Sequence, residues 1–449
     1  MKISIKEIAL FCDSEAKIDG EIYRISTDSR DVDENTLFIA LVGERFDGND
    51  FVEDVLSKGV KAVVCSRYTG EDERVILVKD TGEALLKIAN GYRKKFNIPF
   101  IALTGSVGKT TSKGMIYSVV SRKFNTLRTA GNLNNEIGVP KTLFCLEEKH
   151  QAAVIEMGMN HFDEISRLSK TVLPDIGVIT NVGTAHIENL GSREGILQAK
   201  CEILHGMKKG SPLIINGDND MLKTVKNEDY KIIKFGLEKD NDIYAENIIA
   251  DQKGSFFDVV YDNKKARCFV PSVGVHNVYN ALCAICVGVQ LGCTLEEAIM
   301  GVATFEPEGM RQRVIQVYGM TFIEDCYNAN PDSMCAALES LKTLKEERLI
   351  AVLGDMLELG DYSKKAHALV GEKAAEVGCD IVFTFGNESK IIAENAAKGG
   401  VKAIAYTDKE ELTNYLRSIL REGDTVLFKG SRGMKMEEIF ITLYKEWEV

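Results

Sequence analysis

The sequence predicts an α/β protein of three domains, in which helices cover mostly parallel sheets. Three observations predict this class. Short apolar runs alternate with helical patterns along most of the chain, as expected where crossover helices join parallel strands. The 449 residues suffice for about three domains of ordinary size. The hydrophobic fraction of 45% and the charged fraction of 27% are ordinary for a soluble globular protein.

The first predicted domain covers residues 1–82 and is a small α/β unit. Two apolar runs predict strands, and a helical pattern between them ends at a glycine. The segments 26–30 and 43–50 are polar and charged, and on composition alone they are surface loops. The predicted elements are strands at 36–42 and 61–65 and a helix at 51–58.

The second predicted domain covers residues 83–310 and contains a parallel sheet. Several polar residues follow its apolar runs directly, at the strand ends where open α/β sheets bind ligands. The predicted elements are a helix at 81–96, strands at 100–103, 152–156, 176–181 and 212–215, a strand-rich insert at 243–275 and a helix at 278–291.

The third predicted domain covers residues 311–449. Alternating strands and helices predict a second, Rossmann-like doubly wound unit, although it contains no glycine-rich dinucleotide fingerprint. The predicted strands are 320–323, 349–353, 381–385, 402–405 and 425–428.

Charge and cysteine content restrict the function and the compartment. The net charge of -12 argues against nucleic acid as the main partner, because neutralising phosphates requires a basic surface. The pair Cys283 and Cys286 lies inside a helical pattern with no second pair, so buried reduced thiols are expected rather than a metal or redox site. The N-terminus has no signal-peptide pattern, and no run approaches the ~20 apolar residues of a membrane span. We therefore expect a cytoplasmic protein without membrane insertion.

The strongest functional signal is the segment from Thr104 to Thr111, which reads T-G-S-V-G-K-T-T. It lies between a predicted strand and a predicted helix, the context of a phosphate-binding loop. Gly105 and Gly108 allow a tight turn, Lys109 can reach a terminal phosphate and Thr110 can hold Mg²⁺. The first glycine of the full eight-residue pattern is missing. The alternative is a strand–turn–helix corner with an incidental lysine.

Two residues after strand ends are further candidates. Glu156 ends an apolar run, where a second Mg²⁺ ligand would lie beside a phosphate loop; the alternative is a capping or solvated carboxylate. His186 follows the strand at 176–181 and is as compatible with a structural role as with a functional one. From chemistry alone, Lys200 is a surface lysine on a helix, Asn280 is a helix cap, and Asp325 begins a polar turn.

Together these motifs resemble the Mur ligase family, and the resemblance covers all three predicted domains. Thr27–Arg30 and Gly43–Gly48 resemble the family's UDP-sugar signatures, and Thr104–Thr111 is similar to its shortened phosphate loop, which accounts for the missing glycine. Further segments resemble the branch of the family that adds D-alanyl-D-alanine: Thr129–Pro140, Tyr327–Pro331, Leu353–Gly360 and Lys429–Arg432.

The resemblance implies a role for each matching residue. ATP would be bound by Gly105, Ser106, Gly108, Lys109, Thr110, Thr111, Asn280, Arg311 and Asp325. Two Mg²⁺ ions would be held by Thr110, Glu156, His186 and Lys200, with Lys200 carried as a carbamate; Lys109 and these four residues form the implied catalytic set. The UDP-sugar-peptide would contact Ser29, Arg30, Asp47, Asn134 and Asn135, and the dipeptide Tyr327, Asn328, Asn330, Lys429, Ser431 and Arg432.

The implied reaction is ATP-dependent amide formation between UDP-N-acetylmuramoyl-tripeptide and D-alanyl-D-alanine in peptidoglycan precursor synthesis. The third residue of the tripeptide is left open between diaminopimelate and lysine, and a monomer is expected. The three domains would be a UDP-binding domain, a phosphate-loop ATPase domain and a dipeptide-binding domain. Two alternatives stand beside this interpretation: a folylpolyglutamate-type ligase of the same kind, and a phosphate-loop NTPase acting as a switch or binding module.

Overall fold

The computed structural model describes residues 1–447. The N-terminal part contains a parallel sheet in the order β3-β4-β5-β6 and a separate antiparallel pair, β1 and β2. A capping box between Ser4 and Glu7 begins helix α1. The elements are β1 (Ile3–Ser4), α1 (Ile5–Phe11), β2 (Glu21–Ile22), β3 (Arg24–Ser26), β4 (Thr36–Ile39), η1 (Gly48–Phe51), α2 (Val52–Ser57), β5 (Ala62–Cys65) and β6 (Val75–Leu77).

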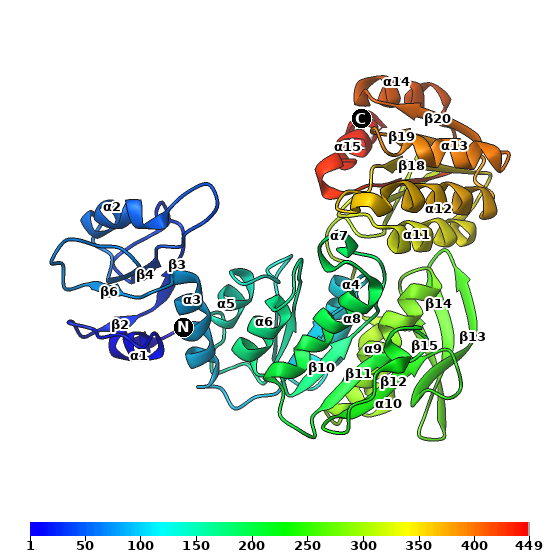
Figure 1. Ribbon diagram of the computed structural model, residues 1–449. Coiled ribbons are helices and arrows are strands. Elements are labelled where there is room, and N and C mark those ends of the chain that lie inside the picture. The colour runs from blue at the N-terminus through cyan, green and yellow to red at the C-terminus, as the bar shows by residue number, and fades with distance from the viewer. Residues whose placement is uncertain (448–449) are drawn as a thin grey trace.

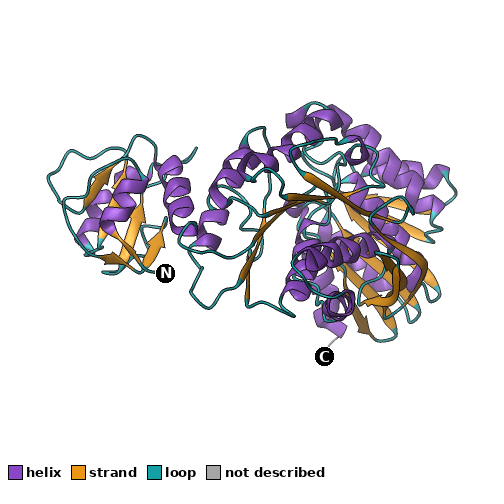
Figure 2. Cartoon of the chain, turned by 90° about the horizontal axis from the view of Figure 1, so that it is seen from below, coloured by secondary structure: helices purple, strands orange, loops and turns teal. Residues whose placement is uncertain are grey.

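Helix α3 (Thr81–Arg93) connects this unit to the rest of the molecule and straddles the predicted boundary at 82/83. It packs against α1 on one side and against the central helices α5 (Gly138–Leu143) and α6 (Glu164–Val172) on the other. The buried Tyr92 hydroxyl donates a hydrogen bond of 2.9 Å to the carbonyl of Leu146. Figures 1 and 2 show the N-terminal unit at one end of the molecule, joined through this helix.

The central sheet has nine strands in the order β15-β14-β13-β12-β11-β10-β7-β9-β8. Pairing is parallel from β13 to β8, and the β13-β14-β15 insert is antiparallel. The strands are β7 (Phe100–Thr104), β8 (Thr126–Arg128), β9 (Ala152–Glu156), β10 (Ile176–Ile179), β11 (Pro212–Asn216), β12 (Lys231–Gly236), β13 (Ile243–Asp251), β14 (Gly254–Tyr261) and β15 (Lys264–Val270).

Both faces of the sheet are buried at β7, β9 and β10, which explains why these strands are continuous apolar runs. In β7, Phe100 and Ala102 face the core shared with α3, α5, α6 and α8. Ile101 and Leu103 face the opposite core, formed with α4, α9 and α10. The helices not yet given are α4 (Lys109–Val120), α7 (Ile187–Leu190), α8 (Arg193–Cys201), η2 (Glu202–Gly206), η3 (Leu222–Thr224), α9 (Val275–Gln290) and α10 (Leu295–Ala303).

The C-terminal sheet has the order β16-β17-β21-β18-β19-β20 and is parallel except for β16. Helices α11, α12 and α13 cover one face, and α14 and α15 cover the other, which confirms the doubly wound prediction. The elements are β16 (Arg313–Val317), β17 (Met320–Asp325), α11 (Pro331–Leu344), β18 (Arg348–Gly354), η4 (Gly360–Tyr362), α12 (Ser363–Glu376), β19 (Ile381–Phe385), α13 (Lys390–Lys398), β20 (Lys402–Tyr406), α14 (Lys409–Ile419), β21 (Asp424–Lys429), η5 (Arg432–Met434) and α15 (Glu437–Trp447).

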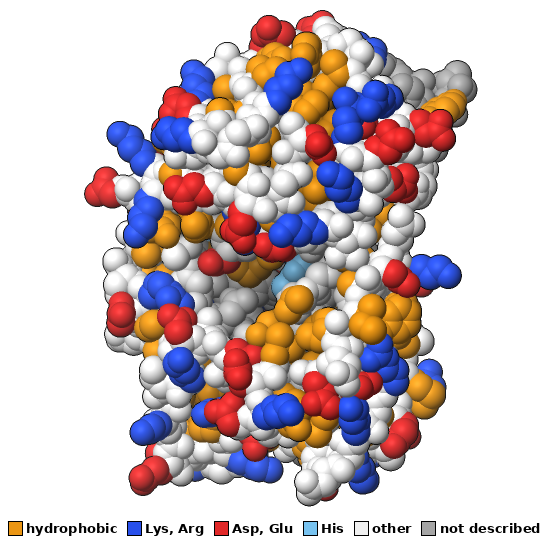
Figure 3. Space-filling model, turned by 90° about the vertical axis from the view of Figure 1, so that its right-hand side faces the viewer, with side chains coloured by type: hydrophobic (Ala, Val, Ile, Leu, Met, Phe, Trp, Pro, Cys, Tyr) orange, Lys and Arg blue, Asp and Glu red, His pale blue; other side chains and the backbone are white. Residues whose placement is uncertain are grey.

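The C-terminal unit lies beside the central one, with α7 packed against η4 at their junction (Figure 1). A space-filling view shows a hollow between the two units (Figure 3). Within residues 1–447, no helix combines the length and the apolar character needed to cross a membrane.

Candidate active site

The loop between β7 and α4 has the backbone geometry of a phosphate loop. Gly108 adopts φ 77° directly before α4. At Gly105 a Cβ would lie 1.9 Å from the Thr180 hydroxyl, so a side chain cannot fit there. The amides of Ser106 and Val107 each donate to the Asn181 side-chain oxygen at 2.9 Å. The loop after β10 therefore holds the phosphate loop in shape, and a bound phosphate would compete with Asn181 for these amides.

Lys109, the first residue of α4, folds back over the loop. Its ammonium donates to the Gly105 carbonyl at 2.7 Å. Burial is the main cause that lowers the pKa of Lys109, and the Arg311 charge acts in the same direction, whereas the Glu156 carboxylate opposes it. An added anion would meet a cation that is already desolvated, so their attraction would be strong.

Glu156 ends β9 opposite the first turn of α4, as predicted, and is 1% exposed. Its carboxylate accepts from the Thr110 hydroxyl at 3.2 Å and from the Asn134 amide at 2.8 Å. Its backbone amide donates to the Thr129 hydroxyl at 3.0 Å. The alternative of a solvated carboxylate is therefore excluded, and two oxygen donors suited to Mg²⁺ lie next to the phosphate loop.

Lys200 is buried and His186 is partly buried, and both are held towards the neutral form. His186 has φ 65°, and its Nδ1 atom is 3.6 Å from the Glu358 carboxylate of the C-terminal unit, too far for a hydrogen bond. Burial, followed by the charges of Lys109 and Lys200, lowers the pKa of His186 to about 4. Lys200 is 1% exposed on α8, and burial lowers its pKa well below the usual value. The surface-lysine alternative for Lys200 is wrong.

A cavity of about 430 Å³ collects most of the predicted residues. Those that line it are Ser106, Gly108, Lys109, Thr110, Thr111, Asn134, Asn135, Glu156, His186, Asn280, Arg311, Asp325, Tyr327, Asn328, Asn330 and Lys429. Its walls come from both the central and the C-terminal units. Gly105, Lys200, Ser431 and Arg432 are not part of its lining.

Three residues predicted in the N-terminal unit lie outside this cavity. Arg30 forms a bidentate pair with Asp28, and the Ser29 carbonyl accepts from Lys58. Asp47 caps η1 and is 3.0 Å from the Arg67 guanidinium. These contacts are those of ordinary charged loops.

The structure corrects the prediction that Asn280 caps a helix. Helix α9 begins at Val275, three residues before the predicted start, so Asn280 is inside the helix and cannot cap it. Its side-chain oxygen accepts from the Ser112 hydroxyl at 2.9 Å, and its amide donates to Asn277 at 3.2 Å. These bonds aim the side chain towards Gly108, where an added Cβ would lie 2.9 Å from the Asn280 oxygen.

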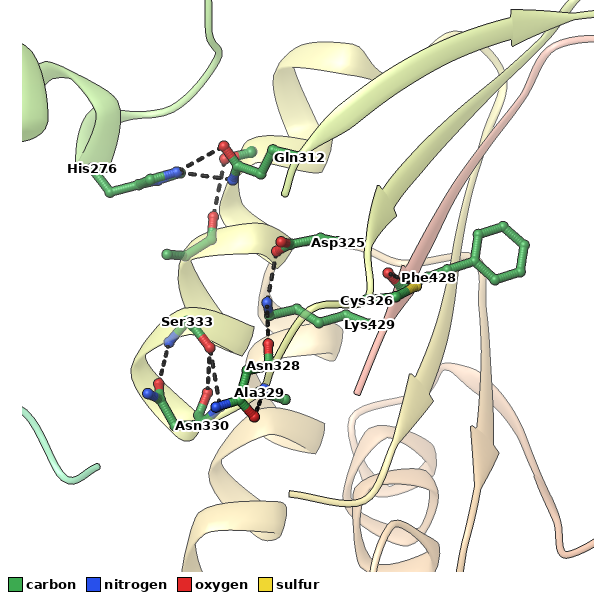
Figure 4. Close-up of polar contacts among 12 residues, drawn as sticks. His276, Gln312, Asp325, Cys326, Asn328, Ala329, Asn330, Ser333, Phe428 and Lys429 are labelled. Carbon is green, nitrogen blue, oxygen red and sulfur yellow. Dashed lines mark hydrogen bonds and ion pairs between the residues drawn. The ribbon is translucent and has the colours of Figure 1, made fainter. Parts of the chain in front are cut away.

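Figure 4 shows the polar contacts after β17. The Lys429 ammonium donates to the Asp325 carboxylate at 2.7 Å and to the Asn328 carbonyl at 3.1 Å, so residues assigned to different ligands form one buried pair. The Asn330 side chain accepts a hydrogen bond from the Ser333 amide and caps α11. This is the local, turn-forming role expected of an asparagine after a strand. The Arg311 guanidinium stacks 3.9 Å from the Tyr327 ring centroid.

Several residues of the site were not predicted. The ring of His276 and the amide of Asn277 both contact the Gln312 side chain. Asp332, at the start of α11, accepts from the Thr184 amide at 3.1 Å. Lys113 is 3.4 Å from Glu156. Only Lys113 had a usable signal, because it follows Lys109 by four residues and therefore shares its helix face.

Comparison with known proteins agrees with this geometry. Three family models match: the Mur ligase family catalytic domain over residues 21–93, the Mur ligase middle domain over 103–288, and the Mur ligase glutamate ligase domain over 310–432. The UDP-N-acetylmuramoyl-tripeptide–D-alanyl-D-alanine ligase of Bacillus subtilis is 40% identical, with 93% of this chain and 92% of that protein covered. The enzyme of the same name from Escherichia coli is 36% identical, with 92% of each covered.

Solved structures match over nearly the whole length. MurF from Acinetobacter baumannii has a TM-score of 0.92 at 33% identity and 99% coverage of both chains. MurF ligase from Thermotoga maritima in complex with ADP has a TM-score of 0.87 at 28% identity, covering 95% of this chain and 98% of that one. A folylpolyglutamate synthase from Mycobacterium tuberculosis, at 14% identity and a TM-score of 0.62, shares the fold alone. The chain therefore belongs to the Mur ligase family.

Proposed function

We propose that this protein is an ATP-dependent ligase that joins D-alanyl-D-alanine to UDP-N-acetylmuramoyl-tripeptide during the synthesis of peptidoglycan precursors in the cytoplasm. One observation carries the proposal: a single cavity joins the phosphate-loop residues Lys109 and Thr110 to the C-terminal residues Tyr327 and Lys429. A ligase needs such a junction because its nucleotide and its second substrate must meet. The names of the full-length relatives support the choice of substrates.

The chemistry explains why ATP is required. A carboxylate does not react with an amine, because its leaving group would be an oxide. Transfer of the terminal phosphoryl group to a carboxylate oxygen of the tripeptide breaks the bond to ADP and forms an acyl phosphate. The free amine of D-alanyl-D-alanine then attacks the acyl carbon, an amide forms, and phosphate leaves with the oxygen it acquired. Lys109 stabilises negative charge on the phosphoryl group during transfer.

The residues beside the phosphate loop fit Mg²⁺. Glu156 and Thr110 supply oxygen donors, and within residues 1–447 no cluster of three or more His, Cys, Asp or Glu side chains forms a complete protein cage. Mg²⁺ in nucleotide enzymes is commonly held by one or two protein oxygens, water and the substrate phosphates. When bound there, it would neutralise charge on the phosphates.

For the second Mg²⁺, we propose that Lys200 acts as a carbamate beside His186. Its amine is buried, and residues 1–447 provide it with no hydrogen-bond or ion-pair partner. Because burial favours the neutral amine, that nitrogen can attack CO₂, forming an N–C bond and releasing a proton. The resulting carboxylate is a ligand for Mg²⁺, which an ammonium cannot be. His186 is close enough for the charge of Lys200 to lower its pKa, and within residues 1–447 its Nδ1 atom has no hydrogen-bond partner.

We also assign one substrate to each predicted domain. Residues 1–82 would bind the UDP end through Ser29, Arg30 and Asp47, and residues 83–310 would bind ATP and, through Asn134 and Asn135, the peptide end. Residues 311–449 would bind the dipeptide through Tyr327, Asn328, Asn330, Lys429, Ser431 and Arg432. Arg311 now stacks on Tyr327, and Asp325 is paired with Lys429. To bind ATP, the side chains of Arg311 and Asp325 would leave these partners and turn towards the nucleotide.

The substrate dependence of phosphate release tests the function. We expect phosphate to be released from ATP only when both UDP-N-acetylmuramoyl-tripeptide and D-alanyl-D-alanine are present. The assay is run with the diaminopimelate tripeptide and with the lysine tripeptide, because the third residue is open. Release without either substrate would instead indicate an NTPase switch. Release that requires a folate and glutamate would indicate the folylpolyglutamate-type alternative, which is supported here only at the level of the fold.

A further inference from the structure

Lys113 is a fully buried cation at the base of the site. Its side chain is 0% exposed and lies on α4 one turn after Lys109. Its ammonium donates to the Gly131 carbonyl at 3.0 Å and is 3.4 Å from the Glu156 carboxylate. A third neighbour is the Glu308 carboxylate, at 3.8 Å. Three segments distant in sequence therefore meet at one nitrogen atom.

The charges around Lys113 are balanced. Arg128 pairs with Glu308, and its guanidinium stacks 4.1 Å from the ring centroid of Tyr117 on α4. Two cations, Lys113 and Arg128, thus face two carboxylates, Glu156 and Glu308. Burying an ammonium is costly unless carboxylates and acceptors compensate for the water it loses. These neighbours compensate for the buried charge of Lys113 and make it part of the structure of the site.

The segment attached to Lys113 is the irregular loop 129–135, between β8 and α5. Gly131 adopts φ 50°, and an added Cβ there would meet nothing within 4 Å, so side-chain packing does not fix this turn. Asn132, Asn134 and Asn135 from the same loop line the cavity. Asn134 and Lys113 approach different oxygens of the Glu156 carboxylate. The loop is therefore fastened to Glu156 at two points, directly through Asn134 and indirectly through Lys113.

We propose that Lys113 is a positioning residue that holds loop 129–135 against Glu156 and thereby sets the affinity for the UDP-tripeptide. The substrate part of this proposal rests on the proposed function, in which Asn134 and Asn135 contact that substrate. The loop part rests on the contacts alone. Lys113 acts through the Gly131 carbonyl and the Glu156 carboxylate and does not itself touch the reacting atoms.

The test compares Lys113→Met with the wild-type protein. Hydrogen exchange measured by mass spectrometry should rise in residues 129–138 and stay unchanged in β7 and β18, because only the loop loses its anchor. Calorimetry should show affinity for the UDP-tripeptide reduced about tenfold or more, the loss expected for a charge-assisted hydrogen bond. Affinity for ADP without Mg²⁺ should change less than about twofold, because the phosphate loop is intact.

Lys123→Met is the matched control, because Lys123 also donates to a glycine carbonyl, that of Gly292, outside the cavity. It should leave both loop exchange and substrate affinity as in the wild type. Lys113→Gln keeps a donor of similar length without the charge, and it serves if Lys113→Met does not fold. Wild-type loop exchange and substrate affinity in a folded Lys113 variant would overturn the proposal. If the wild-type protein does not bind the UDP-tripeptide, the proposed function fails, and the exchange comparison still decides whether Lys113 holds the loop.

Discussion

Lys200 contrasts with Lys113 at the scale of single residues, although both are buried lysines near the phosphate loop. Lys113 has two carboxylates and a carbonyl as partners. Lys200 has none within residues 1–447, and burial lowers its pKa well below the usual value. A buried ammonium without a partner is unstable compared with its neutral form. This difference is the physical reason why we propose a covalent modification at Lys200 and a structural charge at Lys113.

The substitution Lys200→Ala tests that assignment. We expect ligase turnover to fall by about a hundredfold or more, because a group that supports a metal is lost. Added formate or acetate should partly restore turnover by supplying the missing carboxylate. Labelled bicarbonate should give a carbamate signal in the nuclear magnetic resonance spectrum of the wild type and of the control Lys208→Ala, an exposed lysine. Near-normal turnover in Lys200→Ala would show that the carbamate assignment is wrong.

At the scale of secondary-structure elements, the start of α4 depends on Gly108. Its φ of 77° is in the left-handed region, and an added Cβ would lie 2.9 Å from the Asn280 side-chain oxygen. Gly400 has φ 88° and nothing within 4 Å of an added Cβ. At both positions the backbone conformation would strain an L-residue. The positions differ in what an added methyl group would contact.

Alanine at each position separates the two effects. Gly108→Ala and Gly400→Ala should each lower the free energy of unfolding by about 1 kcal/mol, because an L-residue is strained there. Only Gly108→Ala should weaken ADP binding, by about tenfold or more, because it displaces Asn280 beside the phosphate loop. Calorimetric titration with ADP and denaturant unfolding provide the two measurements. Equal ADP affinity in both variants would contradict the role given to the Gly108 corner.

Helix α1 provides a prediction about pH. The hydrogen bond from Lys95 and the Ser4 amide lower the pKa of Glu7 from 4.5 to about 2. Because the folded state holds the ionised form, the resulting stability is complete above pH 4.5 and is lost as the pH falls from 4.5 through 2.

Glu7→Gln should therefore destabilise α1 by about 1 kcal/mol at neutral pH. This value is the usual contribution of a helix cap, reduced because the Glu7 side chain is partly exposed to solvent. The difference from the wild type should narrow as the pH falls below about 4.5, and hydrogen exchange of α1 can follow it. Glu15→Gln, at an exposed position outside the capping box, is the control. A difference in stability between Glu7→Gln and the wild type that does not change with pH would show that the Glu7 carboxylate is not its source.

Apolar runs buried on both sheet faces were predictable, as β7 and β9 show, because burial requires an uninterrupted hydrophobic segment. The edge strand β8 and the two-residue strands β1 and β2 were missed, since they are too short to show a period. Strand β12 was missed because its lysines at 231 and 234 interrupt the apolar run. The start of α9 was misplaced because its first turn contains His276 and Asn277, whose polar side chains contact Gln312 instead of packing in the core.

At the scale of the whole molecule, the cavity is assembled from segments that sequence analysis could name but not place together. Lys429 pairs with Asp325, 104 residues away, because β17 and β21 are neighbouring strands of the C-terminal sheet. The phosphate loop was predictable because its glycines, lysine and hydroxyls are contiguous. Contacts between units, such as Asp332 with Thr184, have no local pattern and required the structure.

These contacts lead to a prediction about domain closure. Asp332 accepts hydrogen bonds from the Thr184 amide and hydroxyl, at 3.1 and 3.4 Å. Asp332→Asn should weaken this link, so the unliganded variant should show a larger radius of gyration in X-ray scattering than the wild type. A non-hydrolysable ATP analogue with the UDP-tripeptide should return both proteins to the same compact state, because closure excludes water from the acyl phosphate. Scattering that is unchanged by ligand in both proteins would contradict closure.

The reaction proposed for this cavity transfers a phosphoryl group to a carboxylate before an amide forms. The most direct measurement uses UDP-tripeptide whose reacting carboxylate carries a heavy oxygen isotope, together with ATP, Mg²⁺ and D-alanyl-D-alanine. We expect one heavy oxygen to appear in the released phosphate and mass spectrometry to detect the joined product. Phosphate without the heavy isotope, or ATP consumption without joined product, would contradict it.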